Sequence, residues 1–286
     1  MTARHPAVAS LFMHLIDDAA VFPPGNALLP DAIAAHRRHR TSSYAVTVGP
    51  LLVPVGWVPE LVALVGEDPV AATLIARPGT ADQIVEQGVS LALAAEHVRV
   101  TGIELPWSPH WRTLAPGELP LALELSREIP LETALDDLTR ARSSGRAVVA
   151  KFRTGATPSW SWPNENELAH VIAGALERSL PFKLTGGLHH LLRAEHDGEP
   201  QHGLLNVLVA TAVALADPVR SDEVAASLAE RDPLALVPIV ESWSTATAAD
   251  VRRAFTAYGC CEVTDPLGEL VDMGLLPHDL SSDLRR

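Results

Sequence analysis

Lys151 and Lys183 are the residues of this sequence best suited to covalent chemistry. The chain contains 22 lysines and arginines, and only these two are lysines. Unlike arginine, a buried lysine can lose its proton, and the neutral amine can attack a carbonyl carbon to form a Schiff base. An arginine-rich composition alone could leave two lysines at arbitrary places. Their sequence surroundings argue against that explanation.

The two lysines occur in similar segments, AKFRTG at residues 150–155 and FKLTGG at residues 182–187. In both, the lysine lies near the end of an apolar run and is followed by Thr-Gly. Their separation of 32 residues corresponds to one strand–helix–strand step. The spacing therefore predicts that the lysines lie on neighbouring parallel strands and are close in space.

The elements that would position the lysines alternate between strand and helix along the chain. Alternation of this kind predicts a parallel sheet, and eight strands within 286 residues suit a (β/α)8 TIM-type barrel formed by one α/β domain over residues 1–286. A doubly wound parallel sheet is the alternative. Strands are expected at residues 18–22, 44–53, 71–76, 98–105, 119–125, 147–152, 180–184 and 260–263. Helices are expected at residues 6–16, 30–40, 58–65, 80–87, 131–143, 164–179, 202–216, 221–230 and 246–257.

The composition excludes several classes of protein. A net charge of −13 argues against nucleic-acid binding, which needs a basic surface. No apolar stretch approaches the ~20 residues of a membrane span, and residues 1–10 lack the pattern of a signal peptide. The two cysteines are adjacent, at 260 and 261, and cannot form a disulfide framework. We therefore expect a cytoplasmic protein with a small-molecule substrate and no nucleic-acid or membrane partner; a homo-oligomer remains open.

Five charged residues interrupt the ends of predicted strands, where a barrel forms its active-site mouth. They are Glu104, Glu124, Lys151, Arg153 and Lys183. Internal ion pairs would be the structural explanation, because buried charges are costly unless they are paired. Repulsion between two ammonium groups, together with burial, predicts that one lysine has a lowered pKa. We assign the nucleophile to Lys151 and the electrostatic tuning to Lys183, with the reverse assignment open.

The segments AKFRTGAT and FKLTGG resemble the strand-end motifs of class I aldolase barrels of the deoxyribose-phosphate aldolase type. The resemblance spans about 40 residues and implies a Schiff-base lysine on the sixth strand and a second lysine on the seventh, the ordinals of Lys151 and Lys183 here. It also implies phosphate binding by Gly186 and Gly187, with Thr185 beside them, and an acidic partner that would be Glu104 in place of aspartate. The chain departs from the pattern where Leu188-His189-His190 follows the glycines. The segments DDAAVFPPG, KFRTG, FKLTGGLHH and HGLLNV also resemble an uncharacterised bacterial family, which implies no function.

Histidines offer a second chemistry. His189, His190 and His202 could bind a divalent metal together with Glu104 or Glu124, although no HExxH or CxxC motif is present. Alternatively, His189 acts as a general acid or base in a lysine-centred site.

Two other features leave their roles open. Asp17 and Asp18 precede Phe22-Pro23-Pro24, and turn formation is the usual role of aspartate in such a place, with the barrel mouth as the alternative. The Trp160 and Trp162 pair would form a lid or pack against the following helix.

The leading hypothesis is an aldolase-like carbon–carbon lyase that acts on a small, optionally phosphorylated carbonyl compound through a Schiff-base lysine. Its catalytic residues would be Lys151, Lys183, Glu104 and His189, and it would need no cofactor. Substrate would contact Arg153, Thr185, Gly186, Gly187, His190 and Glu124. The alternatives are a metal-dependent lyase, isomerase or hydrolase and a non-catalytic barrel that binds an anionic metabolite.

Overall fold

Eight parallel strands close into a barrel within the residues that the computed structural model describes, which are 6–114, 118–217 and 220–284. Neighbours around the barrel follow the chain order, and the last strand, β10, closes it by pairing with both β7 and β1. This confirms the predicted (β/α)8 barrel, and the doubly wound open sheet is wrong. The barrel strands are β1 (Ile16–Asp18), β2 (Val48–Pro54), β3 (Val70–Ile75), β4 (Val98–Pro106), β5 (Leu121–Glu124), β6 (Val148–Arg153), β7 (Phe182–Thr185) and β10 (Phe255–Cys260).

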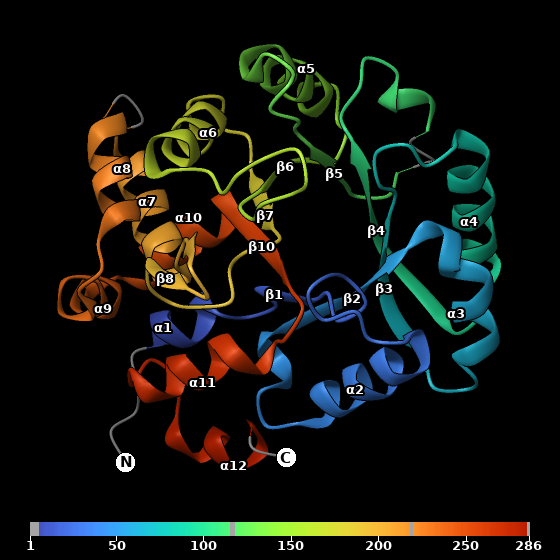
Figure 1. Ribbon diagram of the computed structural model, residues 1–286, viewed down its shortest axis with the longest axis horizontal. Coiled ribbons are helices and arrows are strands. Elements are labelled where there is room, and N and C mark those ends of the chain that lie inside the picture. Colours follow the sequence, from blue (N-terminus) through green and yellow to red (C-terminus); the bar gives the residue numbers. More distant parts are fainter. Residues whose placement is uncertain (1–5, 115–117, 218–219, 285–286) are drawn as a thin grey trace.

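Helices surround the barrel on its outer side (Figure 1). None of those within the described residues is long and apolar enough to cross a membrane. The helices are α1 (Pro6–Leu11), α2 (Leu29–Thr41), α3 (Val58–Leu64), α4 (Asp82–Ala94), α5 (Leu131–Ser143), α6 (Glu165–Glu177), α7 (Leu204–Ala216), α8 (Ser221–Ala229), α9 (Pro233–Ser242), α10 (Thr245–Ala254), α11 (Thr264–Asp272) and α12 (Ser281–Leu284).

The first and last strands differ most from the sequence-based expectation. The expected strand at 18–22 is β1 at Ile16–Asp18, and the helix expected to reach residue 16 ends at Leu11. The strand expected at 260–263 is β10 at Phe255–Cys260. β1 has only three residues, two of them acidic, and β10 contains Thr256 and Gly259, so neither segment is a continuous apolar run.

Several further elements were not expected from the sequence. They are the helices α9, α11 and α12 and a hairpin of β8 (Ala194–His196) and β9 (Glu199–Gln201). By contrast, α5 has the predicted bounds, and α6 begins at the predicted position with a capping box formed by Asn164 and Glu167.

The strand register decides which side chains enter the barrel. Side chains alternate between the two faces of a strand, so Phe182 and Leu184 of β7 face the helices while Lys183 between them points inward. Phe182 stacks in this outer layer on Phe255 of β10, with ring centroids 5.2 Å apart. Lys183 is in register with Lys151 of β6, which confirms that the two lysines lie on adjacent strands.

Replacement of Asn164 by alanine should lower the free energy of unfolding by about 1 kcal/mol. The Asn164 side chain accepts from the Glu167 backbone N–H at 2.9 Å, and the Glu167 side chain accepts from the Asn164 N–H at 2.7 Å. Urea denaturation would measure the change, with Gln87→Ala on the exposed side of α4 as control. Equal stabilities of the two variants would contradict a capping role.

Candidate active site

A cavity of ≈ 700 Å³ opens at the C-terminal ends of the barrel strands. This is the end at which barrel enzymes bind substrate, and the volume lies within the range of small-molecule sites. Its charged and polar lining includes Glu104, Glu124, Lys151, Arg153 and His189. The cavity therefore brings together five of the residues that the sequence singled out.

Lys151 of β6 lies at the base of this cavity between two glutamates. Its Nζ is 2.7 Å from Oε2 of Glu104 on β4 and 2.6 Å from Oε2 of Glu124 on β5. The lysine side chain is 5% exposed and the Glu124 side chain 19%. Glu124 is therefore the more open of the two carboxylates beside the amine, because the Glu104 side chain is only 2% exposed.

Lys183 of β7 is buried and is not part of the cavity lining. Its Nζ donates to Oε1 of Glu104 at 2.5 Å and to Oδ2 of Asp17 on β1. The two oxygens of Glu104 thus contact one lysine each. Internal ion pairs were the structural explanation for the charged strand ends, and they are present.

Asp17 is the member of this network that sequence reasoning assigned wrongly. A turn was expected, but Asp17 is a buried residue of β1. Its carboxylate needs the glycine at position 49 of β2, since a Cβ there would lie 2.0 Å from Oδ1 of Asp17. Asp18 points to the other face of β1, where its Oδ2 is 3.0 Å from Nδ1 of His36 on α2.

The carboxylates keep both lysines protonated. Burial opposes the charged amine, but Glu104 and Glu124 outweigh it and raise the pKa of Lys151, while Asp17 and Glu104 raise the pKa of Lys183. Burial likewise opposes the charged form of Glu104, and the two ammonium groups nevertheless lower its pKa to about 2. The predicted lowering of one lysine pKa is therefore wrong, because more carboxylates surround the amines than the sequence suggested.

Of the expected substrate-contacting residues at the ends of β6 and β7, some line the cavity and one does not. Arg153, Thr185 and Gly186 line the cavity, and the Arg153 Nε is 3.7 Å from Oε1 of Glu124. Gly187 is not in the lining. Gly186 has a φ of +69°, and a Cβ there would lie 2.4 Å from an Arg153 nitrogen, so glycine is required at this bend.

The two adjacent histidines, His189 and His190, have different surroundings. His189 lines the cavity near both cysteines, with Nδ1 3.6 Å from Sγ of Cys260, and burial lowers its pKa. His190 is not in the lining, contrary to its expected contact with substrate. Its Nδ1 is 2.6 Å from Oε1 of Glu269 on α11, and its ring stacks on His196 at 3.4 Å.

The residues of the metal hypothesis do not converge. The Nε2 of His202 is 2.8 Å from the carbonyl oxygen of Pro163, and burial lowers its pKa to about 4. Across the described part of the chain, no group of three or more His, Cys, Asp or Glu side chains has the arrangement of a metal site. The histidines proposed as ligands therefore serve separate contacts.

The tryptophans after β6 have different surroundings. Trp160 lines the cavity, which suits the lid interpretation, whereas Trp162 packs where a Cβ on Gly187 would lie. Trp107, Arg77 and Cys261 also line the cavity and were not expected to. Trp107 follows β4, Arg77 follows β3 and Cys261 follows β10. All three lie in loops, where sequence periodicity does not indicate which side chains face a site.

Fold and site together define a (β/α)8 barrel with a buried lysine–carboxylate network at the C-terminal ends of its strands. No family model matches the chain, and no curated protein matches it. Among solved structures it is similar to a tetrameric deoxyribose phosphate aldolase from Aeropyrum pernix, with 9% sequence identity, a TM-score of 0.40, and coverage of 93% of this chain and 97% of the other. Neither the activity nor the assembly of that protein transfers to this chain on a likeness of this size.

Glu104→Gln should change how stability depends on pH. A carboxyl whose folded pKa is about 2 stabilises the fold above its unfolded pKa and loses that contribution as the pH falls from about 5 towards 2. At neutral pH we expect the variant to be less stable by about 3 kcal/mol, the value of the pKa difference. Urea denaturation at several pH values should show the gap between wild type and variant closing in acid. A gap independent of pH would contradict this account.

Proposed function

We propose that this barrel is an aldolase-like carbon–carbon lyase in which the Lys151 amine forms a Schiff base with a carbonyl substrate. One observation carries the proposal: a buried lysine lies at the base of a substrate-sized cavity, with a carboxylate on either side of its amine. Lysine is the only side chain at this position of the cavity that can form an imine.

Lys151 suits the role of nucleophile better than Lys183. Lys151 lines the cavity, whereas Lys183 lies outside the lining and is held by Asp17 and Glu104. In this assignment, Lys183 fixes the Glu104 carboxylate so that Oε2 stays beside Lys151. Lys183 is then a positioning residue.

A protonated Lys151 must lose its proton before it can attack, and Glu124 is the acceptor that geometry favours. Its Oε2 is 2.6 Å from Nζ and is nearer to solvent than Glu104. Transfer of a proton within this pair leaves the net charge unchanged and replaces two charges by two neutral groups. Substrate that displaces water from the cavity favours the neutral pair, because desolvation penalises charge.

The proposed cycle uses Glu124 twice, as acceptor and donor of a different proton each time. The neutral amine adds to the carbonyl carbon, and the proton on Glu124 leaves with the hydroxyl group as water, which gives a protonated imine. Glu124 then accepts the proton of a β-hydroxyl group, the carbon–carbon bond breaks, and its electron pair moves into the imine to form an enamine. Protonation of the enamine carbon by Glu124 and hydrolysis by water release the second product and restore the charged lysine.

Other cavity residues would orient the substrate. Arg153 supplies a positive charge, and Thr185 and Gly186 form the edge of the cavity beside it. The pKa of His189 is lowered by burial, so its imidazole is neutral at pH 7 and is suited to exchange protons at the mouth.

Borohydride reduction in the presence of an aldehyde should attach the aldehyde carbon skeleton to Lys151. Mass spectrometry of the peptide containing residue 151 would detect the adduct. Lys151→Arg is the matched variant, because arginine keeps a positive charge between Glu104 and Glu124 but forms no imine. Modification confined to Lys183 or to the chain terminus would contradict the assignment.

Glu124→Gln should slow imine formation at pH 7 by about a hundredfold or more, because glutamine does not accept the lysine proton. The rate should recover as the pH rises and hydroxide removes that proton instead. Glu128→Gln is the control, since Glu128 lines the same cavity and is not paired with Lys151. Equal trapping rates for the two variants would show that Glu124 is not the acceptor.

A further inference from the structure

An apolar cluster at the barrel mouth is separate from the main hydrophobic core. It consists of Ala19, Leu52 and Ile75, and Phe22 packs against both this cluster and the main core. All four residues line the cavity, and they come from the region of β1, β2 and β3. The main core lies between strands and helices, so this cluster adds little to that layer and instead forms one side of the cavity.

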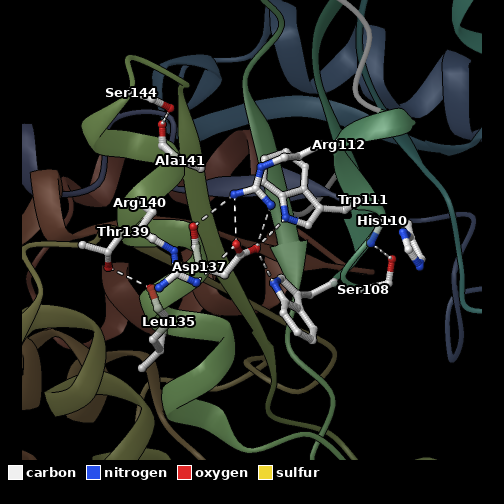
Figure 2. Close-up of polar contacts among 11 residues, drawn as sticks. Ser108, His110, Trp111, Arg112, Leu135, Asp137, Thr139, Arg140, Ala141 and Ser144 are labelled. Atoms are coloured by element: carbon white, nitrogen blue, oxygen red, sulfur yellow. Dashed lines mark hydrogen bonds and ion pairs between the residues drawn. The ribbon is translucent and has the colours of Figure 1, made fainter.

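Trp107, directly after β4, extends this side of the cavity. Its indole Nε1–H donates to Oδ2 of Asp137 on α5 at 3.1 Å. Trp111 and Arg112 donate to the same carboxylate, as Figure 2 shows. Because one acid fixes three side chains of this loop, the ring of Trp107 is held in place against the cavity. We call Ala19, Phe22, Leu52, Ile75 and Trp107 the apolar wall.

Most charged groups of the cavity come from the strands that follow β3. Arg77, in the loop after β3, is an exception, and its guanidinium lies over the Phe22 ring, 4.9 Å from the ring centroid. Glu104, Glu124, Lys151 and Arg153 belong to β4, β5 and β6. The cavity is therefore amphipathic, with the reactive amine on its charged side. Its volume of ≈ 700 Å³ is several times what a two-carbon aldehyde would fill.

We propose that the apolar wall is the binding subsite for a hydrocarbon group of the substrate, of alkyl-chain or phenyl size. The substrate class is then an amphipathic carbonyl compound whose carbonyl carbon lies at Lys151. This inference rests on the proposed function and sharpens it, since a wholly hydrophilic sugar would leave the wall in contact with water. Each methylene that leaves water on binding should raise affinity by up to about fourfold.

The test is borohydride trapping with acetaldehyde, butanal, hexanal and phenylacetaldehyde, each over a range of concentrations. Aldehyde and amine form an imine and water, and hydride reduces the imine to a stable amine that mass spectrometry assigns to Lys151. The half-saturating concentration should fall by at least about tenfold from acetaldehyde to hexanal. Labelling of the terminal amine in the same samples corrects for the intrinsic reactivity of each aldehyde.

Leu52→Ser should remove most of the preference for hexanal while acetaldehyde trapping changes little. Leu234→Ser is the matched control, because Leu234 lies on α9 and is 81% exposed. Should Leu52→Ser fail to fold, calorimetric titration of the wild-type protein with hexan-1-ol and ethanol tests the subsite without any variant. Hexan-1-ol should bind at least about tenfold more tightly.

The outcomes separate this inference from the proposed function. Equal half-saturating concentrations for all aldehydes at Lys151 would overturn the apolar subsite and leave the Schiff-base proposal standing. Preferential hexan-1-ol binding without any adduct on Lys151 would support the subsite and overturn the Schiff-base proposal. A tenfold preference that Leu52→Ser abolishes and Leu234→Ser retains would support both.

Discussion

The bridge formed by Glu104 between two lysines is the interaction on which the site depends. One buried carboxylate contacts Lys151 with one oxygen and Lys183 with the other. Two ammonium groups on adjacent strands would otherwise repel each other in a region with little water. Asp17 and Glu124 complete the compensation from either side. Each buried charge is therefore compensated by an opposite charge from another strand. The ion pairs join residues of β1, β4, β5, β6 and β7.

The balance of charges around Lys151 determines the protonation state of its amine. It raises the pKa of Lys151, which favours the protonated amine. Entry of a substrate with an apolar group would remove water from beside the pair and shift the balance towards neutral partners. In the proposed function, binding of an apolar group to the apolar wall would thus favour the neutral, nucleophilic form of Lys151.

Much of the fold and part of the site could be predicted from the sequence. Charged residues that interrupt apolar strand ends revealed Glu104, Glu124, Lys151 and Arg153, because packing alone rarely explains such interruptions. Asp17 was missed since β1 has only three residues, and two of them are acidic. His189 and His190 are adjacent in sequence, yet only the fold shows that one faces the cavity and the other Glu269. The lysine pKa shifts also needed the fold, because they depend on how many carboxylates surround each amine.

The contact between Asp17 and Lys183 joins residues 166 positions apart and spans β10, which lies between their strands. Position 257 of β10, in register with Lys183, is alanine, which leaves room inside the barrel for this contact. β10, the last barrel strand to be synthesised, therefore lies between the two strands that the Asp17–Lys183 ion pair connects. A chain that lacks the closing strand would have the lysines and the acids without the arrangement that unites them. The lysine–carboxylate network is thus complete only when the barrel has closed.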